Sequence, residues 1–83
     1  MNIYFTKHAE EKFEVLARHG VSISRRKVIA TVKSGVMDYN RSPLLIAQSN
    51  LDKTHILRVI FKKEKGLIII ITFYPGRKSQ YEK

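Results

Sequence analysis

The feature that most constrains the fold is a pair of apolar runs near the C-terminus, joined by a short turn. The runs are Thr54–Lys62 and Leu67–Tyr74, and Glu64, Lys65 and Gly66 lie between them. Both runs are rich in β-branched and aromatic residues, which favour strands, and a glycine in a short connection favours a tight turn. We therefore predict an antiparallel β-hairpin at this position.

The segment before the hairpin carries the signals of two short helices. Apolar residues recur at helical spacing over about residues 7–19 and again over about residues 25–34. Each of these segments lies between a residue that suits a helix N-cap and a glycine that suits a helix stop. In chain order, these signals are Thr6, Gly20, Ser22 or Ser24, and Gly35.

Three further segments have an extended pattern: Asn2–Phe5, Val36–Arg41 and Leu44–Asn50. The order is then one strand, two helices and an antiparallel meander of four strands. It predicts a single α+β domain over residues 1–83. Its two short helices pack on one face of an antiparallel sheet of about four strands.

Alternation along Thr54–Lys62 divides this strand into two faces. The set expected to pack under the helices is His55, Leu57, Val59 and Phe61. The other set mixes cations with isoleucines: Ile56, Arg58, Ile60 and Lys62. An apolar patch of Ile56, Ile60, Ile68 and Ile70 is therefore expected on the helix-free face. Either a partner or the folded-back C-terminal tail covers it.

The charge of the chain is strongly positive, with a formal value of +9 at pH 7. Residues 53–83 contain eight of the 16 Lys and Arg but only two of the seven Asp and Glu. This imbalance favours nucleic acid, an anionic membrane or an acidic protein as a partner. The apolar run Leu67–Tyr74 is too short to cross a bilayer, and we expect a soluble, cytoplasmic protein without a membrane partner.

Few residue types remain that could carry chemistry. There is no cysteine, and the three histidines, His8, His19 and His55, lie far apart, so we expect neither a metal nor another cofactor. Arginine, lysine, tyrosine and histidine can still cleave RNA without a metal, through attack of a 2′-hydroxyl on the adjacent phosphate. In this hypothesis Arg58 and Arg77 converge on one phosphate, and Tyr81 stacks on a base or transfers a proton. The competing interpretation treats Arg58 as an exposed strand cation, Arg77 and Lys78 as tail charges, and His55 as a semi-buried histidine.

Several short motifs resemble those of a bacterial and archaeal domain family of unknown function, which is related to the RelE/ParE and BrnT toxins. They are Thr6-Lys7-His8-Ala9, Arg18-His19-Gly20-Val21, His55-Ile56-Leu57-Arg58-Val59, Ile71-Thr72-Phe73-Tyr74-Pro75-Gly76-Arg77, and Tyr81. The resemblance implies a RelE-like fold and a toxin of a toxin–antitoxin pair. Such a toxin is a metal-independent endoribonuclease that acts on messenger RNA, including ribosome-bound messenger RNA. An acidic antitoxin protein would hold it in check, and a homodimer is possible.

The resemblance also implies roles for individual residues. Arg58, Arg77 and Tyr81 match the catalytic positions, and Lys62 is matched to a phosphate contact. Apart from the resemblance, Lys78 and His55 are further candidates for binding RNA phosphates. Two alternatives stay open beside the nuclease. One is a non-catalytic nucleic-acid-binding module, and the other is a protein-interaction domain with the same fold.

Overall fold

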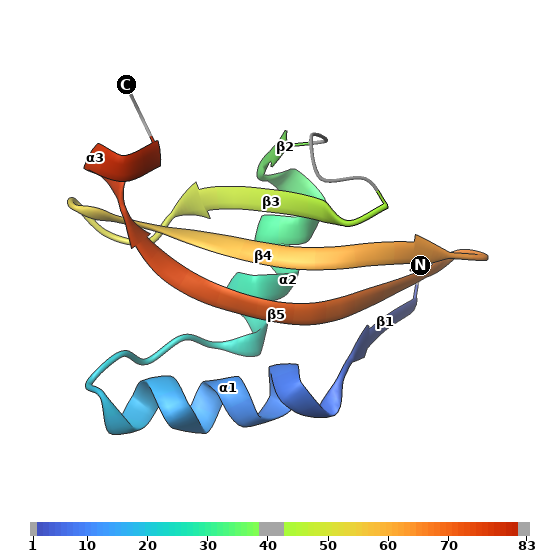
Figure 1. The fold of residues 1–83 in the computed structure, drawn as a ribbon, viewed down its shortest axis with the longest axis horizontal. Coiled ribbons are helices and arrows are strands. Elements are labelled where there is room, and N and C mark those ends of the chain that lie inside the picture. Colours follow the sequence, from blue (N-terminus) through green and yellow to red (C-terminus); the bar gives the residue numbers. More distant parts are fainter. Residues whose placement is uncertain (1, 39–42, 82–83) are drawn as a thin grey trace.

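The computed structural model describes residues 2–38 and 43–81 and forms an α+β fold (Figure 1). In chain order its elements are β1 (Asn2–Phe5), α1 (Lys7–Arg18), α2 (Arg25–Ser34), β2 (Val36–Asp38), β3 (Leu45–Asn50), β4 (His55–Glu64), β5 (Leu67–Arg77) and the short α3 (Lys78–Tyr81). The predicted order of an N-terminal strand, two helices and then strands is confirmed. The part of the predicted strand Val36–Arg41 that follows Asp38 lies outside the described residues.

The sheet differs from the prediction in its size and in the direction of one strand. It has five strands in the order β1-β5-β4-β3-β2, and β1 pairs with β5 in parallel. The other pairs are antiparallel, so the sheet is mixed rather than purely antiparallel. The two helices carry the chain from β1 to the far edge at β2. The meander then returns strand by strand until β5 reaches β1.

Both main helices begin at the predicted caps. The Thr6 hydroxyl oxygen accepts a hydrogen bond from the backbone N–H of Ala9 at 3.1 Å, and that of Ser24 accepts one from Lys27 at 3.1 Å. These contacts satisfy backbone donors that lack a partner in the first helical turn. Gly20 follows α1 with a φ of +80°, a conformation that glycine adopts without strain.

Strand β5 is longer than predicted. The predicted run ends at Tyr74, but β5 continues through Pro75 and Gly76 to Arg77. Proline is tolerated in a strand whose N–H side has no partner. Pro75 meets this condition because β1 pairs only with residues 67–70 of β5 and leaves the later part of that edge free.

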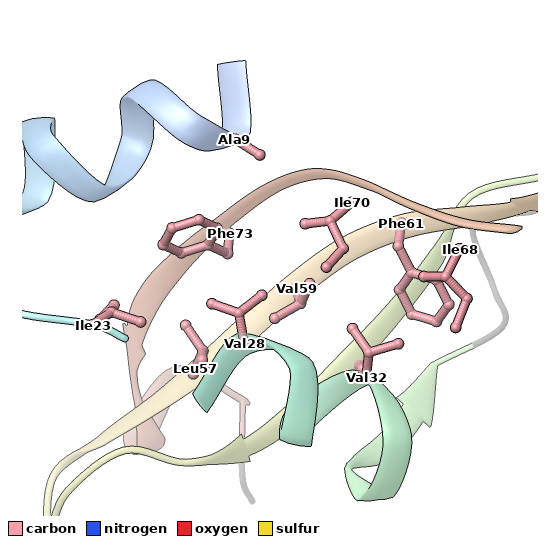
Figure 2. Close-up of a cluster of buried hydrophobic side chains, with 11 residues drawn as sticks. Ala9, Ile23, Val28, Val32, Leu57, Val59, Phe61, Ile68, Ile70 and Phe73 are labelled. Atoms are coloured by element: carbon pink, nitrogen blue, oxygen red, sulfur yellow. The ribbon is translucent and has the colours of Figure 1, made fainter. Parts of the chain in front are cut away.

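A β-bulge between β4 and β5 changes which side chains of β5 face the helices. Ile60 is opposite Thr72 and Phe61 is opposite Ile70, so Ile71 is the extra residue. The core on the helix side therefore takes Ile68 and Ile70 before the bulge and Phe73 after it (Figure 2). The prediction that Ile68 and Ile70 form part of an apolar patch on the helix-free face was thus wrong, because strict alternation does not hold through the bulge.

The main core lies between the sheet and the helices. Leu57, Val59 and Phe61 are fully buried in it, as predicted, and Figure 2 shows Val28 and Val32 of α2 among them. Ile56 is also fully buried, although it is not part of this cluster. Its register partner Gly76 faces the Tyr81 ring, so the tail folds back over this part of the sheet. This outcome agrees with the second of the two alternatives for the helix-free face.

Candidate functional site

Arg58 lies in the middle of β4 and is only 8% exposed. Its Nη1 donates a hydrogen bond to Oε1 of Gln48 at 2.6 Å, and its Nε donates one to the Tyr74 hydroxyl at 3.1 Å. Gln48 and Tyr74 are the register partners of Arg58 on β3 and β5. The sheet therefore places all three side chains in one row across its face.

Tyr81 of α3 covers this row. The Arg58 guanidinium carbon lies 4.2 Å from the centre of the Tyr81 ring, a distance typical of a cation–π contact. The ring also approaches Gly76, where a Cβ atom would lie 2.5 Å from Cε2 of Tyr81. Position 76 thus needs glycine for this arrangement of the tail.

The Arg58 charge is held by neutral groups. Within residues 2–38 and 43–81, no ion pair between Arg58 and a carboxylate is found. A nearly buried cation is costly unless hydrogen bonds or an aromatic face compensate for lost water, and Gln48, Tyr74 and Tyr81 supply this compensation. The cluster of Arg58, Gln48, Tyr74 and Tyr81 is called the Arg58 cluster below.

A second group of candidate residues surrounds a hollow where β4 begins and β5 ends. His55 and Arg77 are register partners, and the Lys78 backbone N–H donates to the Thr54 carbonyl at 2.9 Å. The hollow has a volume of about 450 Å³ and is lined by Lys53, Thr54, His55, Arg77, Lys78 and Ser79. Three of these side chains are cations, so this hollow, called the basic hollow below, favours an anionic ligand.

Asp52 orients His55 at the edge of the basic hollow. One carboxylate oxygen, Oδ1, lies 3.1 Å from Nδ1 of His55 and accepts backbone N–H bonds from Thr54 at 2.9 Å and from His55 at 2.7 Å. The Thr54 N–H is the largest cause that lowers the pKa of Asp52 below its usual value, with smaller contributions from His55. Asp52 therefore stays ionised while it contacts the histidine ring.

The structure brings some of the predicted site residues together and separates others. Arg58 and Tyr81 are stacked on each other, whereas Arg77 lies beside His55. Positions 55 and 58 of β4 are an odd number of residues apart and so project to opposite faces. Arg58 and Arg77 are therefore not on the same face of the hairpin.

The remaining phosphate-binding candidates divide in the same way. Lys78 and His55 both line the basic hollow. Lys62 lies farther along β4, opposite Ile69, and its ammonium is 3.0 Å from a carboxylate oxygen of Glu64. Lys62 thus lies four residues along β4 from Arg58, which contacts Tyr81, and it forms an ion pair with Glu64.

Gln48, Tyr74 and Asp52, which contact Arg58 or His55, were not among the residues predicted from the sequence. Gln48 gave no signal, because its place beside Arg58 depends on strand register. Tyr74 could have been found, since it ends an apolar strand run and can present a hydroxyl. Asp52 carries the clearest signal, because an aspartate in a turn often accepts a hydrogen bond from the backbone N–H two residues later, which here belongs to Thr54.

Within the described part of the chain, no cluster of three or more His, Asp or Glu side chains is arranged to bind a metal ion. No helix in that part is long and apolar enough to span a membrane. Comparison with protein-family models, with curated proteins and with solved structures finds no match for this chain. Function is therefore inferred from the residues and their geometry.

Proposed function

We propose that this protein is a metal-independent endoribonuclease that acts on messenger RNA, as the resemblance to RelE-like toxins implies. The observation that best supports this proposal is the stack of Tyr81 on Arg58. These two residues are 23 positions apart in the sequence, and both are candidates for catalysis. Their contact supports a composite site at the end of the sheet where the C-terminal tail folds back.

The distribution of charge supports RNA as the substrate. The basic hollow next to this end of the sheet contains Lys53, Arg77 and Lys78, and none of the described acids lines it. Arg77 is exposed, and a guanidinium can bind a phosphate through two parallel hydrogen bonds. Because Arg58 and Arg77 lie on opposite faces of the hairpin, an RNA bound by these cations would have to cross the end of the sheet to reach Tyr81.

The chemistry would proceed without a metal. The 2′-oxygen bonds to the adjacent phosphorus while the bond from phosphorus to the 5′-oxygen breaks, which leaves a 2′,3′-cyclic phosphate and a 5′-hydroxyl. Cations stabilise the extra negative charge on the phosphate oxygens in the transition state. Arg77 is the exposed arginine for this role. Arg58 contributes its positive field and holds Tyr81, whose ring is suited to stack on a base.

The proposal includes a regulatory partner. An acidic antitoxin would match the +9 charge of the chain and would cover the basic hollow. Complex formation with such a protein should then block access of RNA.

The test is to induce the wild type, Arg77→Ala and Arg26→Ala in a bacterial host while growth and transcript integrity are followed. Arg26 is an exposed arginine on α2, so its variant changes the net charge equally away from the site. We expect growth arrest and transcript cleavage with wild type and Arg26→Ala, but not with Arg77→Ala. Purified wild type should also cleave RNA in a chelator. Cleavage by a folded Arg77→Ala protein at the wild-type rate would contradict the proposed role of Arg77.

A non-catalytic RNA-binding module is the second candidate, and one observation favours it. Arg58 is nearly buried under Tyr81, so its guanidinium does not face an RNA phosphate in this arrangement. In that case the purified protein would bind RNA with a steep dependence on salt, but no product would form over long incubation.

A further inference from the structure

We infer that His55 is the general base of the proposed reaction and that Asp52 is the positioning residue that prepares it. This inference rests on the proposed ribonuclease function and assigns His55 a role in proton transfer rather than in phosphate binding alone. His55 lines the basic hollow, and its Nδ1 contacts the Asp52 carboxylate in the turn before β4. It is therefore in contact with a carboxylate and next to a candidate site for an anion.

The contacts of the ring determine which nitrogen carries the proton. A carboxylate only accepts hydrogen bonds, so the 3.1 Å contact with Asp52 requires Nδ1 of His55 to donate. The Thr54 hydroxyl oxygen lies 2.8 Å from the same Nδ1 and 3.3 Å from Oδ1 of Asp52. All three contacts are favourable when Nδ1–H points at both oxygens and the Thr54 hydroxyl donates to Asp52. The neutral ring then has a free lone pair on Nε2, as a general base requires.

Asp52 is well fixed for this purpose. Its Oδ1 accepts the backbone N–H groups of Thr54 and His55, which ties the carboxylate to the residue that it orients. The side chain of His55 is 40% exposed, so its ring remains accessible from the hollow. An aspartate that holds a histidine in one tautomer is a recurring device in proton-transfer sites.

The charges that face His55 suit a phosphate substrate. Asp52 and Lys53 lie on the turn before β4, and Arg77 and Lys78 approach from β5 and α3. A phosphate bound by Arg77 and Lys78 would place its ribose near the imidazole. Nε2 takes the proton of the 2′-hydroxyl as the 2′-oxygen bonds to phosphorus. The departing 5′-oxygen takes a proton from water, and the imidazolium later releases its proton to solvent.

The first test is kinetic and compares wild type with His55→Gln, Asp52→Asn and the control His8→Gln. His8 is also exposed, but it lies at the start of α1, where its Nε2 is 3.1 Å from the Thr72 hydroxyl. We expect His55→Gln to lower kcat about 100-fold or more and to bind RNA with nearly unchanged affinity. The dependence of kcat on pH should also weaken in His55→Gln, because glutamine cannot act as a general base. Asp52→Asn should lower kcat more than it changes KM, whereas His8→Gln should behave as wild type.

The second test does not depend on activity. Nitrogen NMR of the histidine rings in wild type should show neutral His55 protonated at Nδ1. In Asp52→Asn this preference should weaken. Inorganic phosphate should shift the Nε2 signal of His55 and leave that of His8 unchanged.

The outcomes separate the two proposals. Cleavage by wild type with equal cleavage by folded His55→Gln overturns the role of His55 and leaves the ribonuclease function intact. Absence of cleavage by folded wild type overturns both. A neutral His55 protonated at Nε2 overturns the base assignment whatever the activity. Loss of cleavage in His55→Gln, together with the Nδ1–H tautomer, supports it.

Discussion

Gly76 and Tyr81 approach so closely that a Cβ atom at position 76 would lie 2.5 Å from Cε2 of the tyrosine ring. Replacement of Gly76 by alanine should therefore displace the ring from Arg58. Tyr81 lies on a four-residue helix near the end of the chain, so the ring can move while the sheet stays intact. We expect the Arg58 Nε–H resonance to lose its ring-current shift and to match that of Tyr81→Ala. The free energy of unfolding should fall by less than about 1 kcal/mol. An unchanged resonance in Gly76→Ala would contradict the stacked arrangement.

Arg58 and Arg77 should differ in their contribution to stability. Arg58→Met removes two hydrogen bonds from a charged donor and leaves Gln48 and Tyr74 without that partner. We expect the free energy of unfolding to fall by about 2 kcal/mol. Arg77→Ala changes an exposed side chain and should cost about 0.5 kcal/mol or less. Urea denaturation of both variants measures the difference, and equal midpoints would argue against a structural role for Arg58.

Gly35 should not tolerate even a methyl group. A Cβ atom there would lie 2.5 Å from the Thr31 carbonyl oxygen and 2.6 Å from that of Gln48, and both of these are backbone atoms. Gly35→Ala should therefore force α2 away from β3 and lower the free energy of unfolding by about 1–3 kcal/mol. The neighbouring exposed Ser34→Ala is the control, since it loses only a hydrogen bond to the Ala30 carbonyl. A lower melting temperature for Ser34→Ala than for Gly35→Ala in thermal denaturation would contradict this expectation.

The Asp52 turn should make stability depend on pH in the acidic range. The pKa of Asp52 is lowered in the folded state from a reference of 3.8, chiefly by the Thr54 backbone N–H. Its ionised form therefore stabilises the fold above that reference pH, and the contribution is lost as pH falls through the folded pKa. Asp52→Asn should be less stable than wild type at pH 6, and the two should converge as the pH falls below the folded pKa of Asp52. A constant difference between the two proteins over that range would count against the charged turn.

Binding to RNA should depend on salt through the basic hollow. Each phosphate contact that is lost should reduce the slope of log K against log salt by about one. Arg77→Ala should show this reduction, whereas the equally charged Arg26→Ala variant should keep a slope closer to that of wild type. Fluorescence anisotropy with a labelled RNA over a salt series measures both slopes. Equal slopes would place the RNA elsewhere on the surface.

The sequence predicts the parts of the fold that depend on local signals. Thr6 and Ser24 mark the helix starts because a hydroxyl before an amphipathic segment satisfies free backbone donors. The parallel pairing of β1 with β5 has no such signal, because its partners Asn2 and Leu67 are separated by most of the chain. The bulge at Ile71 is likewise hidden, since four consecutive isoleucines show no alternation that could reveal a change of face.

The candidate site follows the same division. The residue types Arg58, Arg77 and Tyr81 are visible in the sequence, but their grouping depends on register and on the return of the tail. Arg77 pairs with His55, and His55 and Arg58 project to opposite faces of β4, so the two arginines lie on opposite faces of the hairpin. The contact between Arg58 and Tyr81 depends on the absence of a side chain at Gly76. The motif Tyr74-Pro75-Gly76-Arg77 alone does not reveal this requirement.

The parallel strand pair has a consequence for how the chain reaches this structure. Strand β1 is synthesised first, yet its partner residues 67–70 in β5 emerge only after all the other strands. During translation β1 must wait while β2, β3 and β4 leave the ribosome, and the sheet closes last at its two sequence extremes. Such distant pairing raises contact order and slows folding for a chain of this size. A nascent chain that stalls before residue 67 would therefore hold an unpaired apolar strand, which is the kind of segment that chaperones bind.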